Sequence, residues 1–185
     1  AFSVELELTE TLSRLNYHFF ATKNYMSRVR GGHNFHMIRI ADRAVHALDG
    51  GRWDMVVALD EETQRRHKPN LREGGIFLSR EMTSEIGVAA KEAFANIAAG
   101  NSILVGIVLA VIGVSPEKLA AAAEPGREEY LIKGFEFAGK WKLTGAFPVS
   151  ATARAHRKFD GNQALAIGAI LGGCQFMAGY PMTPA

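Results

Sequence analysis

The part of the chain best suited to bind an anion is a short basic loop, Ser-Arg-Val-Arg-Gly-Gly-His-Asn at residues 27–34. The guanidinium groups of Arg28 and Arg30 each present a planar fork of donors to phosphate or carboxylate. Gly31 and Gly32 let backbone N–H groups approach the same anion, and Asn34 adds a side-chain donor. The alternative is a glycine turn whose arginines pair with acidic surface neighbours. Taken alone, the pattern slightly favours that turn.

The end of the chain carries a second group of candidate residues, in Gly-Tyr-Pro-Met-Thr-Pro at residues 179–184. A residue before proline is restricted to extended backbone, so Tyr180 and Thr183 are expected to be extended. The Thr183 hydroxyl then lies on a stiff loop shaped by Tyr180 and Pro181. The preceding segment, residues 174–177, is short and apolar and predicts a buried parallel strand, and open α/β sheets bind ligands at the carboxyl ends of strands. An ordinary proline-rich turn explains the spacing equally well.

The elements that position these residues alternate between strand and helix patterns. Period-two or continuous apolar patterns predict strands over residues 17–22, 35–40, 53–59 and 74–79, with residues 43–47 as a hairpin-like return beside 35–40. Helical spacing and capping signals predict helices over residues 3–15, 61–68 after Asp60, 83–99, 101–114, from Ser115 onward, and 128–138. This alternation predicts an α/β protein with three layers, a sheet covered by helices on both faces.

The C-terminal part reads as a linker followed by the first piece of another domain. Residues 145–160 combine glycine, proline and serine with a basic run, which is typical of a connection between domains. Asp160 is expected to cap a helix that begins near Gly161. We therefore expect one domain over residues 1–144, a linker over 145–160, and the start of a second domain over 161–185.

Composition limits the classes of function. The 185 residues are 48% apolar and 22% charged with a net charge of +2, so nothing predicts binding to nucleic acid or to an anionic membrane. A single cysteine excludes a disulfide framework and a four-cysteine cluster held by this chain alone. The most apolar run, residues 103–114, is too short to span a membrane, and no signal peptide is visible, so we expect a cytoplasmic protein. We also expect that a strand and a glycine-rich turn precede Ala1, and that further residues lie within the tight junctions at 79–83 and 123–127.

Longer motifs resemble one enzyme family. Residues 25–40 are similar to the signature of the gamma domain of 2-oxoacid:ferredoxin (acceptor) oxidoreductases, in which Ser-Arg-x-Arg-Gly-Gly leads into a strand ending in Ile-Arg-Ile. Val-Ala-Leu-Asp at residues 57–60 and Leu-x-x-Gly-Gly-Ile at residues 71–76 also match the family pattern. The tail, with Gly-Asn-x-Ala-x-Ala-x-Gly-Ala and then Gly-Tyr-Pro-x-Thr-Pro, resembles the opening of the pyrimidine-binding domain of the same enzymes. This order is similar to a fused alpha subunit.

The resemblance implies a reaction shared among subunits. Such enzymes decarboxylate a 2-oxoacid on thiamine diphosphate with Mg²⁺, pass electrons through [4Fe-4S] clusters to ferredoxin, and transfer the acyl group to coenzyme A. The resemblance assigns contacts with coenzyme A to Arg28, Arg30, Gly31, Gly32 and Asn34, and contacts with thiamine diphosphate and the 2-oxoacid to Tyr180, Pro181 and Thr183. Thr183 would be the catalytic donor. It also implies a thiamine diphosphate-binding beta subunit, ferredoxin and a homo- or hetero-oligomer, with no cofactor held by this chain alone. The chain alone should be inactive.

Other interpretations are weaker. His33 and His36 have a His-x-x-His spacing, but they lie where a loop becomes a strand, so their side chains are not expected to converge on a metal. Cys174 could be a nucleophile, yet it is expected to be buried in an apolar strand without a nearby base. A second function is a non-catalytic module that holds subunits together, for which the apolar helix over 101–114 is well suited. The 2-oxoacid itself stays open, with a slight preference for the 2-oxoglutarate-like group.

Overall fold

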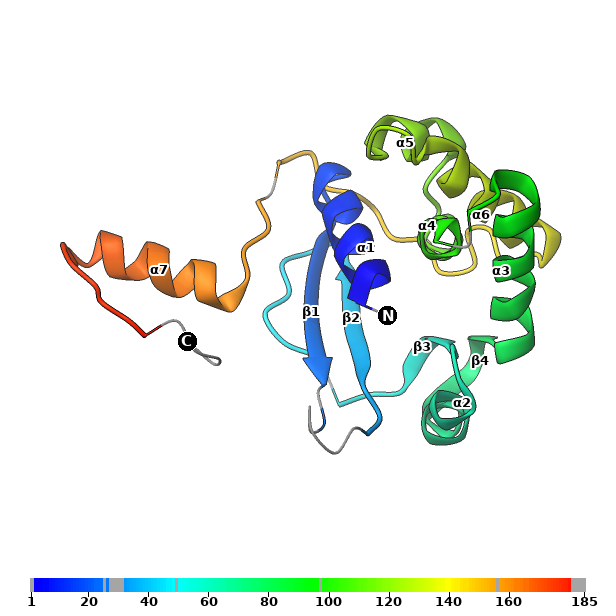
Figure 1. The fold of residues 1–185 in the computed structure, drawn as a ribbon, viewed down its shortest axis with the longest axis horizontal. Coiled ribbons are helices and arrows are strands. Elements are labelled where there is room, and N and C mark those ends of the chain that lie inside the picture. The colour runs from blue at the N-terminus through cyan, green and yellow to red at the C-terminus, as the bar shows by residue number, and fades with distance from the viewer. Residues whose placement is uncertain are drawn as a thin grey trace.

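The computed structural model describes residues 2–24, 26, 32–48, 50–96, 98–155 and 157–180. The first half of the chain contains both strands and helices, and helices make up the second half (Figure 1). In chain order the elements are α1 (Phe2–Arg14), β1 (His18–Asn24), β2 (Phe35–Ala41), β3 (Trp53–Val57), α2 (Glu61–His67), the 3-10 turn η1 (Lys68–Asn70), β4 (Leu71–Leu78), α3 (Arg80–Phe94), α4 (Ala99–Val111), α5 (Pro116–Ala122), α6 (Glu128–Lys140) and α7 (Gly161–Leu171). The predicted α/β class is confirmed.

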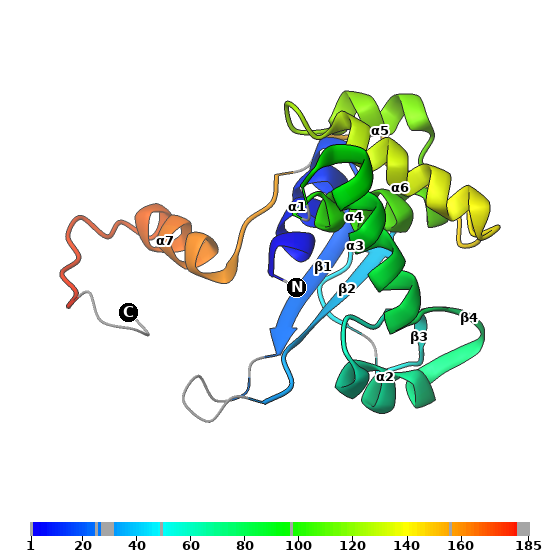
Figure 2. The same ribbon diagram turned by 45° about the vertical axis from the view of Figure 1, so that its right-hand side comes forward.

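The described strands form two pairs. β1 and β2 are antiparallel, in register from His18 opposite Ala41 to Asn24 opposite Phe35, and they lie side by side below α1 (Figure 2). β3 and β4 are parallel, with Met55 opposite Ile76. The prediction that residues 43–47 pair with the strand over 35–40 is wrong, because these residues form no strand, and the described partner of β2 is β1. The 43–47 segment is instead reached by a side chain, since the Arg39 guanidinium donates to the Ala47 carbonyl at 3.4 Å.

The predicted three layers are clearest around β3 and β4. Ile76 and Leu78 of β4 are buried in a core with α3, α4 and α6. Phe77, the residue between them, faces the opposite side, where the Lys68 ammonium of η1 lies 5.0 Å from the centre of its ring. The alternation of a strand therefore places helical elements on both sides of this pair.

The middle of the core is α4. Ile103, Val105, Ile107 and Leu109 are fully buried, and α4 contributes to both hydrophobic clusters of the domain. Gly106 of α4 and Gly134 of α6 allow the two helices to pack closely. A Cβ at Gly106 would lie 2.2 Å from the Leu131 carbonyl oxygen, and a Cβ at Gly134 would lie 2.2 Å from the Ile103 carbonyl oxygen. None of the described helices is long and apolar enough to cross a membrane on its own; α3 and α4 meet those criteria only as a pair bent by 117°.

Helix starts follow the capping residues. Asp60 accepts a hydrogen bond from Thr63 N at 2.6 Å at the start of α2, and Ser115 precedes Pro116 at the start of α5. The predicted start of α3 at residue 83 is wrong, because Ser79 caps the helix and it begins at Arg80. Ser79 directly follows β4, so a single residue makes this junction.

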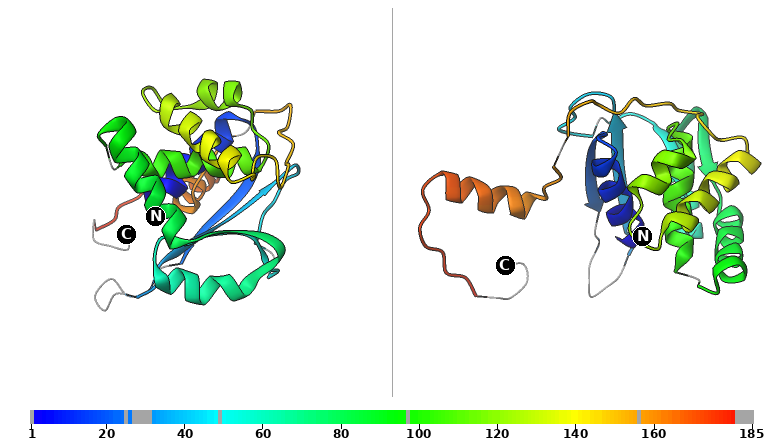
Figure 3. Two further views of the ribbon diagram at one scale, coloured as in Figure 1. Left: turned by 90° about the vertical axis from the view of Figure 1, so that its right-hand side faces the viewer. Right: turned by 90° about the horizontal axis from the view of Figure 1, so that it is seen from above.

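The C-terminal helix stands apart from the rest of the fold. Figures 1 and 3 show α7 away from the other helices, at the end of an extended segment. The predicted Asp160 cap is confirmed and forms a capping box with Gln163. Large apolar side chains of this region are 71–86% exposed, namely Leu165, Ile170, Leu171, Phe176 and Met177. The two hydrophobic clusters contain only residues 4–149, so α7 adds nothing to this core.

The predicted strand over residues 174–177 is wrong, and so is the predicted burial of Cys174. These residues have no regular secondary structure, and the cysteine is exposed. A strand needs a neighbour for its backbone hydrogen bonds, and none of the described strands lies beside this segment.

Candidate functional site

The base of the loop between β1 and β2 is closed by a hydrogen bond from the backbone to a side chain and by a close approach at a glycine. Met26 N donates to Asn34 Oδ1 at 2.9 Å across the loop. Gly32 has a φ of +135°, and a Cβ there would lie 2.6 Å from the Cβ of Met26. Gly32 and Asn34 therefore lie at the base of the predicted anion loop, whereas Arg28, Arg30 and Gly31 lie outside the described residues. The Asn34 amide oxygen closes the loop, which is a structural role that the sequence prediction did not include.

The far side of this base is fixed to α2 by an imidazole pair. His33 is 8% exposed, and its Nε2 lies 2.9 Å from Nε2 of His67. Phe35 stacks on His33 with ring centroids 5.4 Å apart and contacts His67 at 4.5 Å. Burial lowers the pKa of His67, and the positive charges of His33 and Arg66 act in the same direction. Sequence reasoning missed His67, which is 34 residues away from its partner.

The near side is fixed to α1 by a buried carboxylate. Glu5 Oε2 lies 3.0 Å from Lys23 Nζ on β1 and 3.5 Å from His36 Nδ1 on β2. Lys23 and His36 are opposite each other in the ladder. Burial lowers the pKa of His36, while the Glu5 carboxylate opposes that shift. Helices on two sides thus hold the loop end of the hairpin.

The histidines at 33 and 36 have different partners. His33 contacts His67 of α2, whereas His36 faces Glu5 of α1. In the part of the chain that the structure describes, no three His, Cys, Asp or Glu side chains are grouped so that they could hold a metal ion. The His-x-x-His spacing therefore does not bring its two rings to one point.

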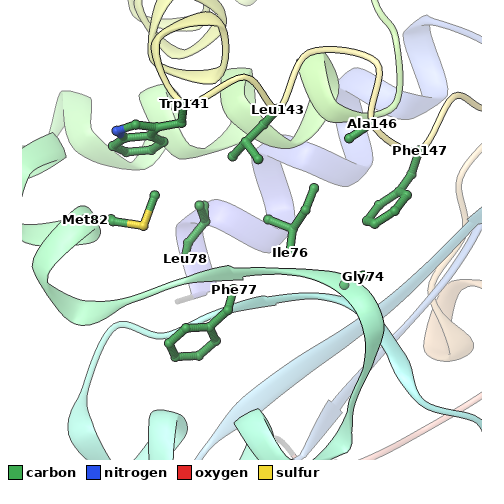
Figure 4. A pocket seen from close by; sticks show the side chains of 10 residues that line it. Gly74, Ile76, Phe77, Leu78, Met82, Trp141, Leu143, Ala146 and Phe147 are labelled. Carbon is green, nitrogen blue, oxygen red and sulfur yellow. The ribbon is translucent and has the colours of Figure 1, made fainter.

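Elsewhere on the domain there is an apolar cleft. It is a cleft of about 610 Å³ between β4 and the segment that follows α6. Figure 4 shows Ile76 and Leu78 pointing toward Leu143, Ala146 and Phe147, while Phe77 points away. The whole lining consists of Gly74, Gly75, Ile76, Phe77, Leu78, Met82, Trp141, Leu143, Ala146 and Phe147. A cleft without charged side chains is unsuited to phosphate or carboxylate.

The two groups of predicted site residues are not brought together in the described part of the chain. Tyr180 is 77% exposed and follows α7, which stands away from the β1–β2 hairpin (Figure 1). Pro181 and Thr183 lie outside the described residues. The loop base is held in place by several contacts with other elements, whereas Tyr180 is an exposed side chain outside the core.

Comparison with known proteins identifies the family. The family model described as pyruvate ferredoxin/flavodoxin oxidoreductase matches residues 2–131, which is more than half of the chain. The chain belongs to this family. The match begins with α1 and ends within α6, so the region that defines a pyruvate ferredoxin/flavodoxin oxidoreductase includes the hairpin loop and the elements that hold it on both sides.

Two solved structures of related oxidoreductases have a similar fold. The 2-oxoglutarate:ferredoxin oxidoreductase from Magnetococcus marinus, solved with 2-oxoglutarate, coenzyme A and succinyl-CoA bound, matches 98% of this chain with a TM-score of 0.74 and 18% identity. The gamma subunit of a keto/oxoacid ferredoxin oxidoreductase from Geobacter sulfurreducens PCA matches 75% of this chain and 90% of its own, with a TM-score of 0.58 and 20% identity.

The chain spans 36% of the length of the Magnetococcus marinus chain. No curated protein matches its sequence. The family match and the two folds confirm the predicted gamma-type domain of a 2-oxoacid:ferredoxin oxidoreductase.

Proposed function

We propose that this gamma-type domain binds the phosphates of coenzyme A through the β1–β2 loop, within an enzyme that oxidises a 2-oxoacid and passes the electrons to ferredoxin. The observation that carries the proposal is the anchored base of that loop. Met26, Gly32 and Asn34 close it, and helices α1 and α2 hold it from two sides. A fixed base is what a phosphate site needs, because donors that are already in place lose little entropy on binding.

The residues of the loop fit the chemistry of a phosphorylated ligand. Arg28 and Arg30 have guanidinium forks and Gly31 has no side chain, and in the sequence they directly precede the closed base. The Magnetococcus marinus enzyme with a similar fold was solved with coenzyme A and succinyl-CoA bound, which supports a coenzyme A ligand for this family.

The rest of the reaction belongs to other parts of the assembly. Thiamine diphosphate, when bound, supplies the carbanion chemistry that releases CO₂ from the 2-oxoacid. This chain has one cysteine, so [4Fe-4S] clusters need ligands from other chains or segments. We therefore propose a thiamine diphosphate- and Mg²⁺-binding beta subunit and ferredoxin as partners in an oligomer.

The tail is proposed to open the pyrimidine-binding domain, with Thr183 as a donor near the 2-oxoacid and with Tyr180 and Pro181 shaping its loop. Two observations support this. The helix α7 carries its own capping box yet leaves its apolar side chains exposed, as expected of a piece whose core lies elsewhere. The Magnetococcus marinus chain also matches 98% of this chain, against 75% for the separate gamma subunit.

The test is a binding measurement on the natural full-length protein with its co-purifying subunits. Isothermal titration with coenzyme A should give saturable binding, and Arg28→Ala with Arg30→Ala should weaken it at least about a hundredfold, since each charge-assisted contact contributes about 1.5–3 kcal/mol. Arg43→Ala with Arg52→Ala is the matched control, because both of these arginines are exposed and lie outside the loop. Equal binding by both double variants would remove the proposed site.

The alternative function is a non-catalytic module that joins subunits. The exposed apolar side chains of α7 favour it, because such surfaces are usually covered by a partner. It predicts that the complex assembles normally and that coenzyme A does not bind to it at all.

A further inference from the structure

The strongest unexplained contact in the fold joins the anion loop to α2. His33 directly follows Gly32 and directly precedes Asn34, the two residues that close the loop base. Its ring is buried, and its Nε2 lies 2.9 Å from Nε2 of His67, the last residue of α2. Because His33 is buried, its ring needs this bond, since an unpaired buried donor or acceptor costs about 1–3 kcal/mol.

The α2 helix is a firm support for this contact. Asp60 caps its first turn through Thr63 N at 2.6 Å, and the Arg80 guanidinium of α3 lies 2.5 Å from the Glu61 carboxylate. The helix ends at His67, and Pro69 in the following 3-10 turn prevents it from continuing. The chain leads from this end of α2 through η1 directly into β4, so a ring here lies close to the parallel strand pair.

The bond between the two rings depends on their protons. A hydrogen bond between two Nε2 atoms needs one protonated and one unprotonated nitrogen, so either ring can donate but both cannot be imidazolium. The charged groups that face His67 are His33 from the hairpin, Arg66 from its own helix and Asp60 at the helix start. Burial, His33 and Arg66 lower the pKa of His67, and Asp60 raises it in partial compensation. The lowered pKa of His67 favours its uncharged form, which can pair with His33, and the bond is impossible only when both rings are imidazolium.

We propose that His67 is a positioning residue for the ligand: its hydrogen bond to His33 holds Gly32 and Asn34 in the geometry that binds the phosphate of coenzyme A. This inference rests on the proposed function, in which the loop binds coenzyme A. His67 itself touches no ligand in this scheme and acts only through His33.

Two substitutions separate the hydrogen bond from the packing. His67→Phe keeps an aromatic ring against Phe35 but removes the nitrogen. His67→Gln loses the ring but keeps an amide that can donate to a neutral His33 or accept from a protonated one. His46→Gln is the matched control, because His46 is exposed in the segment after β2. All variants are made in the full natural protein and purified with its partner subunits.

The measurement is the dissociation constant of coenzyme A by titration calorimetry at about pH 8 and at about pH 5.5, on either side of the ordinary range of histidine. At the higher pH, His67→Phe should weaken binding about fivefold to tenfold, as expected for one lost hydrogen bond, while His67→Gln should stay within about twofold of the wild type. At the lower pH the advantage of the wild type over His67→Phe should shrink only as far as both rings become protonated, and His67→Gln, which can pair with either form of His33, should change least with pH. Coenzyme A titrates in this range as well, so each comparison is made between variants at one pH.

Hydrogen exchange gives a readout that needs no ligand. The backbone amides of residues 32–34 should exchange faster in His67→Phe than in His67→Gln or His46→Gln. If the wild type binds no coenzyme A, the proposed function fails and this exchange still decides whether His67 holds the loop base. If coenzyme A binds and His67→Phe matches the wild type at both pH values, the positioning role is refuted. Equal losses in His67→Phe and His67→Gln would also refute it, because ring packing and not the hydrogen bond would then matter.

Discussion

Replacing Gly134 with alanine should destabilise this domain, even though alanine is the better helix former. Gly134 lies where α6 crosses α4, and a Cβ there would lie 2.2 Å from the Ile103 carbonyl oxygen and 2.7 Å from the Gly106 Cα. Both are backbone atoms, so no side chain can rotate away. Because ordinary contact begins at 3.4 Å, the helices must separate by about 1 Å at the centre of the core.

The expected loss follows from two opposing effects. Overpacking a tight core costs about 1–3 kcal/mol, and backbone on both sides places this site at the upper end. The better helix propensity of alanine returns about 1 kcal/mol. The net fall in the free energy of unfolding is therefore about 2 kcal/mol.

Urea unfolding followed by tryptophan fluorescence measures this difference. The matched control is Gly139→Ala in the same helix, where a Cβ would meet no atom within 4 Å. That variant should be unchanged or stabilised by up to about 1 kcal/mol. If Gly134→Ala proved as stable as Gly139→Ala, the close crossing of α4 and α6 would be refuted.

Three further predictions concern a buried carboxylate, the core compared with the tail, and the cap of α2. Burial raises the pKa of Glu7 above 4.5, although Ser102 donates to it and Arg127 is close. The folded protein therefore holds the Glu7 proton more tightly than the unfolded chain, and the stability gained from this is present below about pH 4.5 and lost as pH rises through the raised pKa. In Glu7→Gln the free energy of unfolding should no longer fall over that pH range. Leu109→Ala should cost about 2–5 kcal/mol in urea unfolding and Leu171→Ala less than about 0.5, because the first is fully buried and the second is 83% exposed. Asp60→Ala should lower the melting temperature through the loss of the α2 cap, about 1 kcal/mol, and restoring it with Asn should recover most of that loss.

Local chemistry explains what the sequence predicts correctly. The caps at Asp60 and Asp160 depend on residues within one helical turn, so the sequence contains the whole interaction. The apolar run over residues 101–114 likewise predicts a helix, but α4 is buried inside the domain core and is not available for the subunit packing suggested for it.

Contacts between distant residues explain what the sequence does not predict. Residues 43–47 form no strand although their pattern resembles one, because a strand depends on pairing between segments and β2 pairs with β1. The strand expected at 174–177 has an apolar pattern without a neighbour in the described chain. His67 reads as a basic residue at a helix end, and only the fold brings it to His33. Gly32 and Asn34 lie where the motif indicates, but the amide of Asn34 closes the loop.

The most direct test of the central claim is coenzyme A-dependent reduction of a dye by the purified complex, supplied with a panel of 2-oxoacids. The account predicts activity with at least one acid, complete dependence on coenzyme A, and a large rise in the coenzyme A concentration needed for half-maximal rate in the Arg28→Ala, Arg30→Ala variant. The account would be contradicted by an intact complex that contains thiamine diphosphate and iron–sulfur clusters but reduces no dye with any 2-oxoacid.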